Sequence, residues 1–468
     1  MVDIVNSSKA LSVNPLKVSQ RVGAVLAFLG LSRSLPLEHG VRGCAAFAKL
    51  FFMRHFREPI PLQTTAMDQT CTILGADENV IEALQTLIER NHPEIVGIVA
   101  STLSEFQGID LPRTLAEFRR RFPEHDGVAI VPVSVFGDFD SLELGFAHAI
   151  EALVETLVPT TFHEVTCSLQ VNILASAMLT PGDVNALKEW VEAFGLRPVV
   201  VPDLGDALDG HLVDQGFLPL TYGGVARVEI EQLGQAMATL VIGTSMERAA
   251  NLLTAKTAVP NYCFSSLMGV QACDDLTHTL HTLSGRPVPE RLVRQRAQLL
   301  DAMVDCQFYT AGTSAALAGD PDLVGMLLRF LNDVGVTVPT VVTTTRVASL
   351  QNLPAGRIVI GDLDDLEHEA SESSVQLLLA NSHAVSIANR LGVPLLRVGY
   401  PQHDLIGCHT KTWIGYAGTR QSLFDVANLL MQARGDKQPY TSIYRQTDDG
   451  AAASAGAARR SGKERTAA

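Results

Sequence analysis

The sequence predicts an α/β fold of three sequential domains, in which helices connect parallel strands. Short apolar runs alternate with amphipathic stretches from about residue 90 onward. This pattern is typical of βαβ units, because a parallel strand needs a crossover to return the chain. Apolar residues make up 47% of the 468 residues and charged residues only 18%, as expected where strands are buried on both faces.

Individual elements follow from local patterns. Helices are predicted over 77–93, where the first turn is acidic and a Pro closes the stretch, and over 181–195, which opens with Pro-Gly-Asp and stops at a Gly. The predicted strands are 95–101, 128–133, 168–176, 196–202, 238–245, 305–312, 337–345, 356–362, 375–382 and 394–399.

Pro and Gly interrupt the periodicity near residues 160 and 290, which divides the strands into three groups. We therefore predict α/β domains over 1–160, 161–289 and 290–435. Residues 436–468 consist of Ala, Gly, Ser and charged residues without an apolar period. Such a segment cannot offset the entropy of ordering, so we predict a disordered tail.

Charge and missing motifs exclude several function classes. The net charge of −14 disfavours nucleic acids and anionic membranes as partners, because both repel an acidic protein. The sequence has no apolar run of spanning length and no signal peptide, which predicts a cytoplasmic protein. It lacks a Walker A loop, so ATP hydrolysis by a P-loop on this chain is not expected. It also lacks a dinucleotide-binding Gly motif and a nucleophile elbow, which argues against dinucleotide binding of the usual kind and against α/β-hydrolase chemistry.

The chain has seven scattered cysteines and no C-x-x-C pair, which argues against a disulfide framework or a self-contained zinc site. The acidic run 362–369 is interpreted as a solvated loop or a helix start rather than a metal site, and His278 and His281 as ordinary histidines. Cys408 and His409 are adjacent rather than spaced for joint coordination. Buried packing is the interpretation for Cys71, Cys167, Cys263, Cys273 and Cys306.

The most informative segment is 34–69, where Cys44 follows the turn His39-Gly40-Val41-Arg42-Gly43 and opens a helix. A thiol at a helix N-terminus, next to an Arg, is in an environment that favours the thiolate, the form that binds iron. The alternative is that Cys44 fills space under the helix as a small apolar residue. A cubane cluster usually takes four thiolates, so a ligand role would require cysteines from a partner chain.

The string HGVRGCAAFAKLFFMRHFREPIP, residues 39–61, resembles the cluster-binding region of the nitrogenase β-subunit superfamily. Further similar strings occur at 19–30, 77–87, 100–110, 282–312, 319–335 and 393–404, so the resemblance covers roughly residues 12–430. It implies the nitrogenase component 1 architecture, in which each of three domains is a parallel sheet flanked by helices, and it places the Fe–S cluster loop in the first domain.

Differences in the cluster cysteines distinguish the members of this family from one another. Nitrogenase β subunits supply three cysteines to the P cluster. Only the first of them has a counterpart in this chain, which is Cys44. The other two positions are taken by Leu62 and by Thr102 or Leu103. The resemblance therefore implies one corner of a smaller [4Fe–4S] cluster, with Cys44 as the metal ligand and three cysteines from the partner subunit.

The strings are most similar to those of the β-like subunit of the scaffold complex that builds the iron–molybdenum cofactor. This resemblance implies a non-catalytic subunit paired with NifE in an α2β2 heterotetramer. Further implied partners are the ATP-hydrolysing Fe protein NifH, the NifB-derived precursor, bound transiently by the complex, and apo-nitrogenase. The alternatives are a β-type subunit of a catalytic reductase, either nitrogenase or dark-operative protochlorophyllide reductase, and a structural partner without a cluster.

Arg42, Arg54, His55 and Arg57 are not assigned to a site, because charges on such a helix are by default solvated or in salt bridges.

Overall fold

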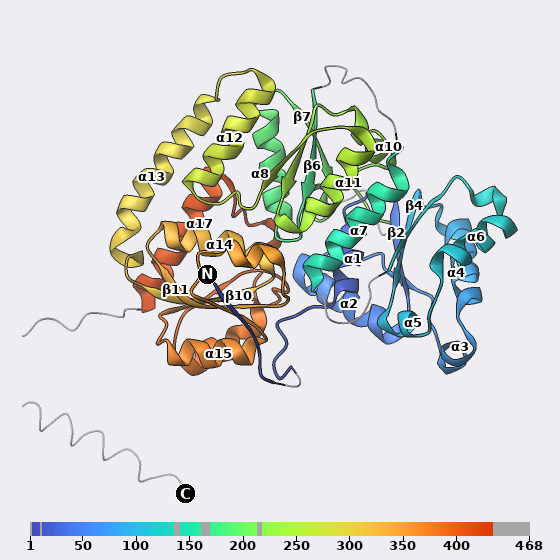
Figure 1. Ribbon diagram of the computed structural model, residues 1–468, viewed down its shortest axis with the longest axis horizontal. Helices are drawn as coiled ribbons and strands as arrows, with labels where there is room; N and C mark the ends of the chain where they lie inside the picture. Colours follow the sequence, from blue (N-terminus) through green and yellow to red (C-terminus); the bar gives the residue numbers. More distant parts are fainter. Residues whose placement is uncertain (1, 10–11, 135–140, 161–168, 213–217, 434–468) are drawn as a thin grey trace, which may run out of the picture. The chain divides into compact units, whose positions relative to one another are not determined.

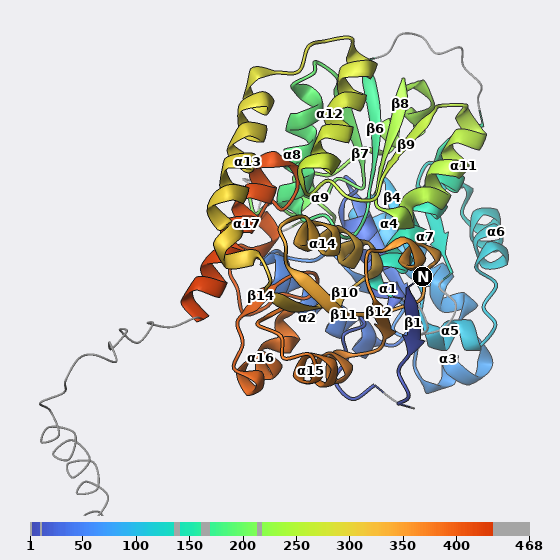
Figure 2. The ribbon, with the colours of Figure 1, turned by 60° about the vertical axis from the view of Figure 1, so that its left-hand side comes forward.

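The computed structural model describes residues 2–9, 12–134, 141–160, 169–212 and 218–433. Within these residues the strands form three sheets, and every strand pairing in them is parallel. Helices cover the faces of the sheets (Figures 1 and 2). This confirms the predicted α/β class. The predicted tail, 436–468, lies outside the described residues.

The first sheet has the strand order β3-β2-β4-β5. Its strands are β2 (Ser34–His39), β3 (Gln63–Thr64), β4 (Ile95–Ala100) and β5 (Ala129–Val133). The helices of this region are α1 (Gln20–Leu29), α2 (Arg42–Phe56), α3 (Gln69–Leu74), α4 (Asp77–Asn91), α5 (Thr102–Phe106), α6 (Leu111–Arg121) and α7 (Leu142–Leu157). Residues of α4 and α6 pack on one face, and those of α1, α2 and α7 on the other.

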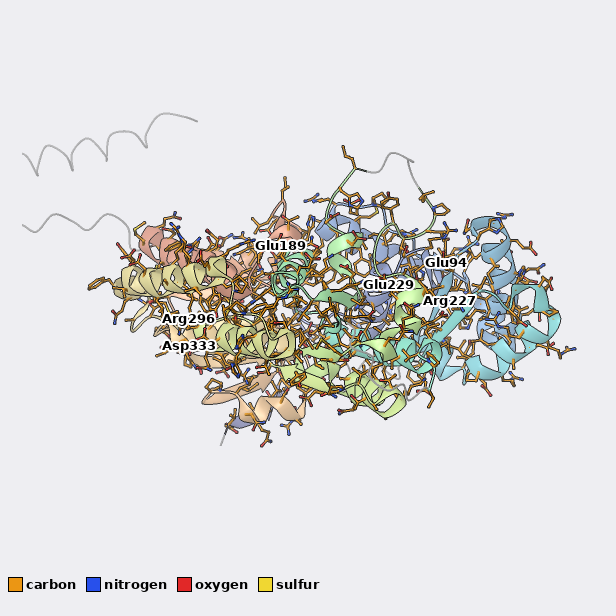
Figure 3. The ribbon with its side chains drawn as sticks, turned by 90° about the horizontal axis from the view of Figure 1, so that it is seen from above. Glu94, Glu189, Arg227, Glu229, Arg296 and Asp333 are labelled. Carbon is orange, nitrogen blue, oxygen red and sulfur yellow. The ribbon has the colours of Figure 1, made fainter. Side chains whose placement is uncertain are left out.

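The second sheet has the order β7-β6-β8-β9. Its strands are β6 (Gln170–Ala175), β7 (Arg197–Val201), β8 (Ala238–Ile242) and β9 (Asn261–Phe264). The helices are α8 (Pro181–Glu192), α9 (Leu204–Ala207), α10 (Arg227–Glu231), α11 (Glu247–Thr257), α12 (Val270–Ser284) and α13 (Glu290–Thr310). Arg227 of α10, labelled in Figure 3, donates to the carbonyl of Gly127 at 2.6 Å and so links this region to the first.

The third sheet has the order β1-β12-β11-β10-β13-β14. Its strands are β1 (Asp3–Asn6), β10 (Ser314–Gly319), β11 (Thr337–Thr343), β12 (Arg357–Ile360), β13 (Leu377–Ala380) and β14 (Leu395–Arg397). The helices are α14 (Pro321–Asp333), α15 (Leu363–Glu372), α16 (Val385–Leu391) and α17 (Gly415–Ala433).

Two parts of the chain differ from the sequence prediction. Residues 305–312, predicted as a strand, include the last turns of α13, and the strand of this region is β10. The N-terminal strand β1 pairs with β12 in the third sheet, although the first predicted domain begins at residue 1. The domain boundaries at 160 and 289 stay a prediction.

The apolar cores extend across these regions. One cluster of buried side chains joins the inner face of the first sheet to residues of β6, β7 and β8. Another joins the second sheet to the third through α8, α12 and α14. None of the described helices is both long enough and apolar enough to cross a membrane.

Helices α1 and α7 approach one another very closely through two glycines. A Cβ on Gly23 would lie 1.8 Å from the carbonyl oxygen of Leu142, and a Cβ on Gly145 would lie 1.7 Å from that of Gln20. Real atoms do not approach so closely, so a side chain at either position would force the helices apart. The contact fixes α1 against α7 beneath the first sheet.

Candidate functional site

Cys44 lies where the carboxyl end of β2 leads into α2. All six residues of β2 are buried between its parallel neighbours β3 and β4. The helix begins at Arg42, with Val41 as its N-cap, so Cys44 is the third helical residue rather than the first. It is half-buried and still in the first turn. The carboxyl edge of a parallel sheet is where α/β proteins usually bind ligands.

Backbone and side-chain bonds fix the turn before Cys44. Thr65 donates from its backbone to the carbonyl of Glu38 at 3.1 Å, and Met67 donates to the carbonyl of Gly40 at 2.9 Å. The Gly40 amide donates to the Thr65 hydroxyl at 3.2 Å. From the other side, Ser101 donates to the carbonyl of His39 at 3.0 Å. The loops after β2, β3 and β4 are therefore joined at one edge of the sheet.

Two buried polar residues end β2 where this turn begins. His39 is fully buried, its Nδ1 lies 2.9 Å from the Thr65 hydroxyl, and burial lowers its pKa to about 4. Its ring is therefore neutral at physiological pH. Glu38 is also buried and accepts from Arg21 of α1. Burial raises the pKa of Glu38, and Arg21 partly offsets that rise.

The two glycines of the turn have different roles. A Cβ on Gly40 would lie 2.8 Å from the side chain of Ser101, so Gly40 allows the ends of β2 and β4 to approach. Around Gly43 no atom lies within 4 Å of the Cβ position, apart from its two neighbours in the chain and the backbone of its own helix. The space beside the first turn of α2 is therefore open.

The positions that the resemblance assigns to the other two cluster cysteines lie next to β3 and at the start of α5. Leu62 is buried just before β3. Thr102 is the first residue of α5, and Leu103 is partly exposed. None of these side chains binds iron. Within the described residues, no group of three or more His, Cys, Asp or Glu side chains is placed to hold a metal ion.

The remaining cysteines confirm some of the predictions and contradict others. Cys273 and Cys306 are buried, as predicted. Cys263 is exposed, because β9 is the edge strand of its sheet, and the packing interpretation was wrong there. Cys71 is only half-buried in the short helix α3, where the Asp68 carboxylate accepts from its amide, so it is not a core residue. Cys167 lies outside the described residues.

The acidic run 362–369 starts α15, as predicted, with Asp362 as the N-cap. A cation already lies among these carboxylates. The Lys9 ammonium is 2.5 Å from Asp362, 3.0 Å from Asp364 and 3.2 Å from Asp365. His281 is bonded at Nδ1 to the carbonyl of Arg286, at 2.6 Å.

The outer face of α2 is apolar and basic. Phe47, Leu50 and Met53 are exposed, with Phe47 66% exposed, while Ala48, Phe52 and Phe56 on the opposite face are buried. Arg42, Arg54 and Arg57 are exposed on the same helix and its C-cap. No acidic residue occurs between Arg42 and Arg57. His55, by contrast, is buried, and burial lowers its pKa to about 3, so it carries no charge on this surface.

Sequence reasoning did not identify Glu38, Arg21 or Thr65 as parts of the site. Glu38 and His39 could have been singled out from the sequence, because they are polar residues at the end of an apolar strand. The contact between Glu38 and Arg21 and that between His39 and Thr65 depend on the tertiary fold, so they could not be found from sequence spacing.

Comparisons with known proteins agree with this architecture. The profile of the family described as "Nitrogenase component 1 type Oxidoreductase" matches residues 19–431. A protein of Klebsiella pneumoniae named nitrogenase iron-molybdenum cofactor biosynthesis protein NifN is 42% identical, over 98% of this chain and 99% of its own length. A Nostoc protein of the same name is 43% identical, over 91% and 95%. The solved structure titled "Nitrogenase Cp1 at pH 6.5" superposes with a TM-score of 0.87 at 26% identity, over 94% of this chain and 98% of that chain. The chain therefore belongs to the nitrogenase component 1 type oxidoreductase family.

Proposed function

We propose that this chain is a non-catalytic scaffold subunit on which, together with a NifE-type partner, the iron–molybdenum cofactor of nitrogenase is assembled. The observation that carries the proposal is Cys44, half-buried in the first turn of α2 at the carboxyl edge of the first sheet, with non-ligating residues at the positions that the resemblance assigns to the other cluster cysteines. The relatives named as cofactor biosynthesis proteins support it over nearly their full length.

The residues around Cys44 fit one corner of a shared [4Fe–4S] cluster. The thiol is half-buried in the first turn of a 15-residue helix, and the neighbouring Gly43 leaves the adjoining space open. Unpaired amides of a first helical turn favour an anionic ligand. A cubane cluster usually takes four thiolates, so in this proposal the three further thiolates come from the partner subunit. Bound there, the cluster would supply one-electron chemistry.

This chain's own residues would position the thiol. The bonds from Thr65, Met67 and Ser101 fix the turn, and His39 at its start stays neutral because its pKa is about 4. A rigid turn holds Cys44 in one place.

The exposed apolar face of α2 is the proposed contact with the NifE-type subunit. Phe47, Leu50 and Met53 follow Cys44 on the same helix. Exposed apolar patches rimmed by polar residues mark interaction surfaces. The exposed arginines of α2 favour an acidic surface on the partner. Two such pairs form the proposed α2β2 heterotetramer.

A second exposed surface lies beside the same sheet edge. Ile73 of α3 is 81% exposed and Phe106 of α5 is 83% exposed. The two helices are tied together, because Gln107 donates to the carbonyl of Cys71 at 3.2 Å. We propose this surface as this chain's part of the docking site for the Fe protein NifH, on which ATP is hydrolysed. The complex would receive the NifB-derived precursor and pass the finished cofactor to apo-nitrogenase.

The test is anaerobic co-expression with the NifE-type subunit, followed by iron analysis and EPR of the reduced complex. Cys44→Ala is expected to abolish the [4Fe–4S] signal while the complex stays assembled. Cys71→Ala removes another half-buried thiol from the same region and serves as the matched control, with iron content unchanged. Equal iron content in the wild type and the Cys44→Ala variant would mean that Cys44 only packs.

A catalytic reductase subunit is the second candidate, because the closely superposing structure is titled a nitrogenase. Turnover of the purified complex with Fe protein and ATP separates the two. Efficient reduction of dinitrogen or protochlorophyllide would contradict the scaffold role.

A further inference from the structure

Basic side chains from two distant parts of the sequence meet at the C-terminal end of α2. Arg54 lies in the last turn of this helix, and Arg57 is its C-cap. His383 follows β13, in the short helix η5 (Ser382–Ala384), and His403 follows β14. The two arginines therefore come from the first region of the fold, and the two histidines come from the third.

Four contacts hold these residues together. The Arg57 guanidinium donates to the carbonyl of His403 at 3.4 Å. The ring of His383 lies edge-on to that of Phe51 in α2, with ring centroids 6.2 Å apart. The centroids of the His383 and His403 rings are 5.4 Å apart, and the His403 amide donates to the Ser382 hydroxyl at 3.0 Å. Both imidazoles therefore lie against the end of α2.

The positive charge at this place is not balanced by an ion pair. Within the part of the chain that the structure describes, neither Arg54 nor Arg57 forms a salt bridge. Burial, followed by the positive charge of Arg54, lowers the pKa of both His383 and His403. The two rings are therefore neutral at physiological pH, and the two guanidinium groups carry the charge.

The acidic residue next to His403 is already paired. The Asp404 carboxylate accepts from the Arg397 guanidinium at 2.8 Å and from the Ser382 hydroxyl. Its negative charge raises the pKa of His403, but burial and Arg54 lower that pKa by more. Asp404 therefore does not neutralise the basic cluster.

One polar atom of the cluster has no partner. The Nδ1 atom of His403 is buried and forms no hydrogen bond with any residue that the structure describes. His383, by contrast, is bonded to the carbonyl of Pro15. Buried polar groups in proteins are almost always bonded to protein, water or an ion. The orphaned nitrogen is an independent sign that a small polar ligand belongs here.

We propose that Arg54, Arg57, His383 and His403 form a binding site for a small tetrahedral oxyanion, the class that includes phosphate, sulfate and molybdate. The guanidinium groups supply charge and N–H donors in the fork geometry that matches such anions. Donors that converge from two segments suit an anion with oxygens on all sides better than a planar carboxylate. The inference goes beyond the proposed function, because it needs neither Cys44 nor a cluster.

An acidic surface of the partner subunit is the other occupant that the charges allow. Carboxylates on a protein surface reach exposed arginines, whereas a small anion also reaches the buried Nδ1 of His403. Arg42 lies twelve residues before Arg54 on the same helix, about 18 Å away, and stays available to the partner. The unpartnered nitrogen therefore favours the small anion at this end of α2.

Isothermal titration calorimetry of the co-expressed complex tests the proposal. The buffer contains chloride only, and the ligands are sodium phosphate, sulfate and molybdate, each added separately. Arg54→Gln removes a charge, and His403→Phe keeps a ring but removes its nitrogens. Each is expected to weaken binding by about tenfold or more, because charge-assisted hydrogen bonds are lost. Arg294→Gln, at an exposed position of α13, is the matched control and should bind as the wild type does.

The pH dependence gives a second readout. A bound anion raises the pKa of His383 and His403, which burial and Arg54 keep low in the free protein, so binding takes up protons. Arg54, Arg57 and Asp404, the other charged groups near these rings, keep their charges between about pH 6 and pH 8. The affinity for sulfate is therefore expected to rise as the pH falls over this range. His403→Phe should make the affinity less dependent on pH.

The outcomes separate the sources of the anion and the two proposals. Binding of molybdate alone would identify molybdate as the ligand, and similar binding of all three anions would identify a general oxyanion site. Wild-type affinity in both Arg54→Gln and His403→Phe would overturn the site. Absence of binding to the wild-type complex would also overturn it, in favour of an acidic partner surface. Iron content should stay unchanged in both variants, because Cys44 lies at the other end of α2. Loss of iron with unchanged anion binding would count against the cluster assignment instead.

Discussion

Glu38 is a carboxylate within an apolar strand, and its stability there depends on Arg21. The side chain is 1% exposed and accepts from the Arg21 guanidinium, which reaches it from α1. A buried charge that loses its partner is strongly destabilising. Because Glu38 directly precedes His39 and the Cys44 turn, this ion pair stabilises the base of the candidate site.

Arg21→Met removes the charge and keeps an apolar stem. We expect the free energy of unfolding at pH 7 to fall by about 3 to 5 kcal/mol, the usual loss when one partner of a buried pair is removed. The measurement is urea unfolding of the complex. The double variant R21M/E38Q should recover part of the loss, because a neutral Gln needs no cationic partner.

The loss should depend on pH in a defined direction. Burial raises the pKa of Glu38 above its ordinary value of 4.5, and without Arg21 it rises further. A carboxyl that binds its proton more tightly when folded makes stability fall as the pH rises above the unfolded pKa. The penalty of Arg21→Met is therefore expected to shrink as the pH is lowered toward 4.5. An equal penalty at pH 5 and pH 7 would contradict this account.

At single residues, the sequence predicted the local position in a helix better than burial. Cys44 was identified as the thiol at a helix start, and the structure places it in the first turn of α2. Cys263 was predicted to be buried because it lies in an apolar segment. Its exposure follows from the edge position of β9, and strand order cannot be read from composition.

Among the helices, the contact between α1 and α7 is the most sensitive to a small change. Gly145→Ala places a methyl group 1.7 Å from the carbonyl oxygen of Gln20, so the helix backbones must separate. Overpacking typically costs about 1 to 3 kcal/mol, and backbone that cannot yield gives the upper end. We expect a loss of at least about 2 kcal/mol in the free energy of unfolding.

Gly43→Ala is the matched control for this prediction. Gly43 is also helical, but no atom lies within 4 Å of its Cβ position. Ala is the better helix former by roughly 0.5 to 1 kcal/mol, so the control should be neutral or slightly stabilising. Similar unfolding midpoints for the two variants would show that α1 and α7 are not held by close packing.

Helices and strands with a clear period of apolar residues were predictable from the sequence. A strand whose partner is distant in the sequence was not. Helices α4 and α8 and the strands β4 to β8 lie within the predicted ranges. Residues 305–312 were mistaken for a strand because of their aromatic and apolar composition. The buried positions Leu299, Ala302, Cys306 and Thr310 follow the helical period instead. The strand β1 was missed because its partner, β12, lies more than 350 residues away.

At the scale of the whole chain, one buried carboxylate ties the three regions together. Asp322, at the start of α14, accepts from Ser176 after β6 at 3.0 Å and from the Thr244 amide after β8 at 2.9 Å. Its own amide donates to Glu143 of α7 at 2.8 Å. These partners are 146, 78 and 179 residues away. No local pattern could reveal them, which is why the sequence predicted three groups of strands and not their shared core.

On the surface of the whole molecule, an exposed side chain can contribute to binding of a partner without contributing to the stability of the fold. Phe47 is 66% exposed on α2, so Phe47→Glu should leave the thermal unfolding of the chain nearly unchanged. In the complex with the NifE-type subunit, a charge in an apolar contact is expected to weaken binding at least tenfold, which is about 1.4 kcal/mol. Because the cluster needs ligands from both subunits, iron content should fall in parallel with binding. Val228→Glu, at a position of similar exposure on α10, is the control and should change neither quantity. If Phe47→Glu bound the partner as tightly as the wild type, the outer face of α2 would not be the subunit contact. The proposal of a shared cluster would then lack the contact that places Cys44 at the interface.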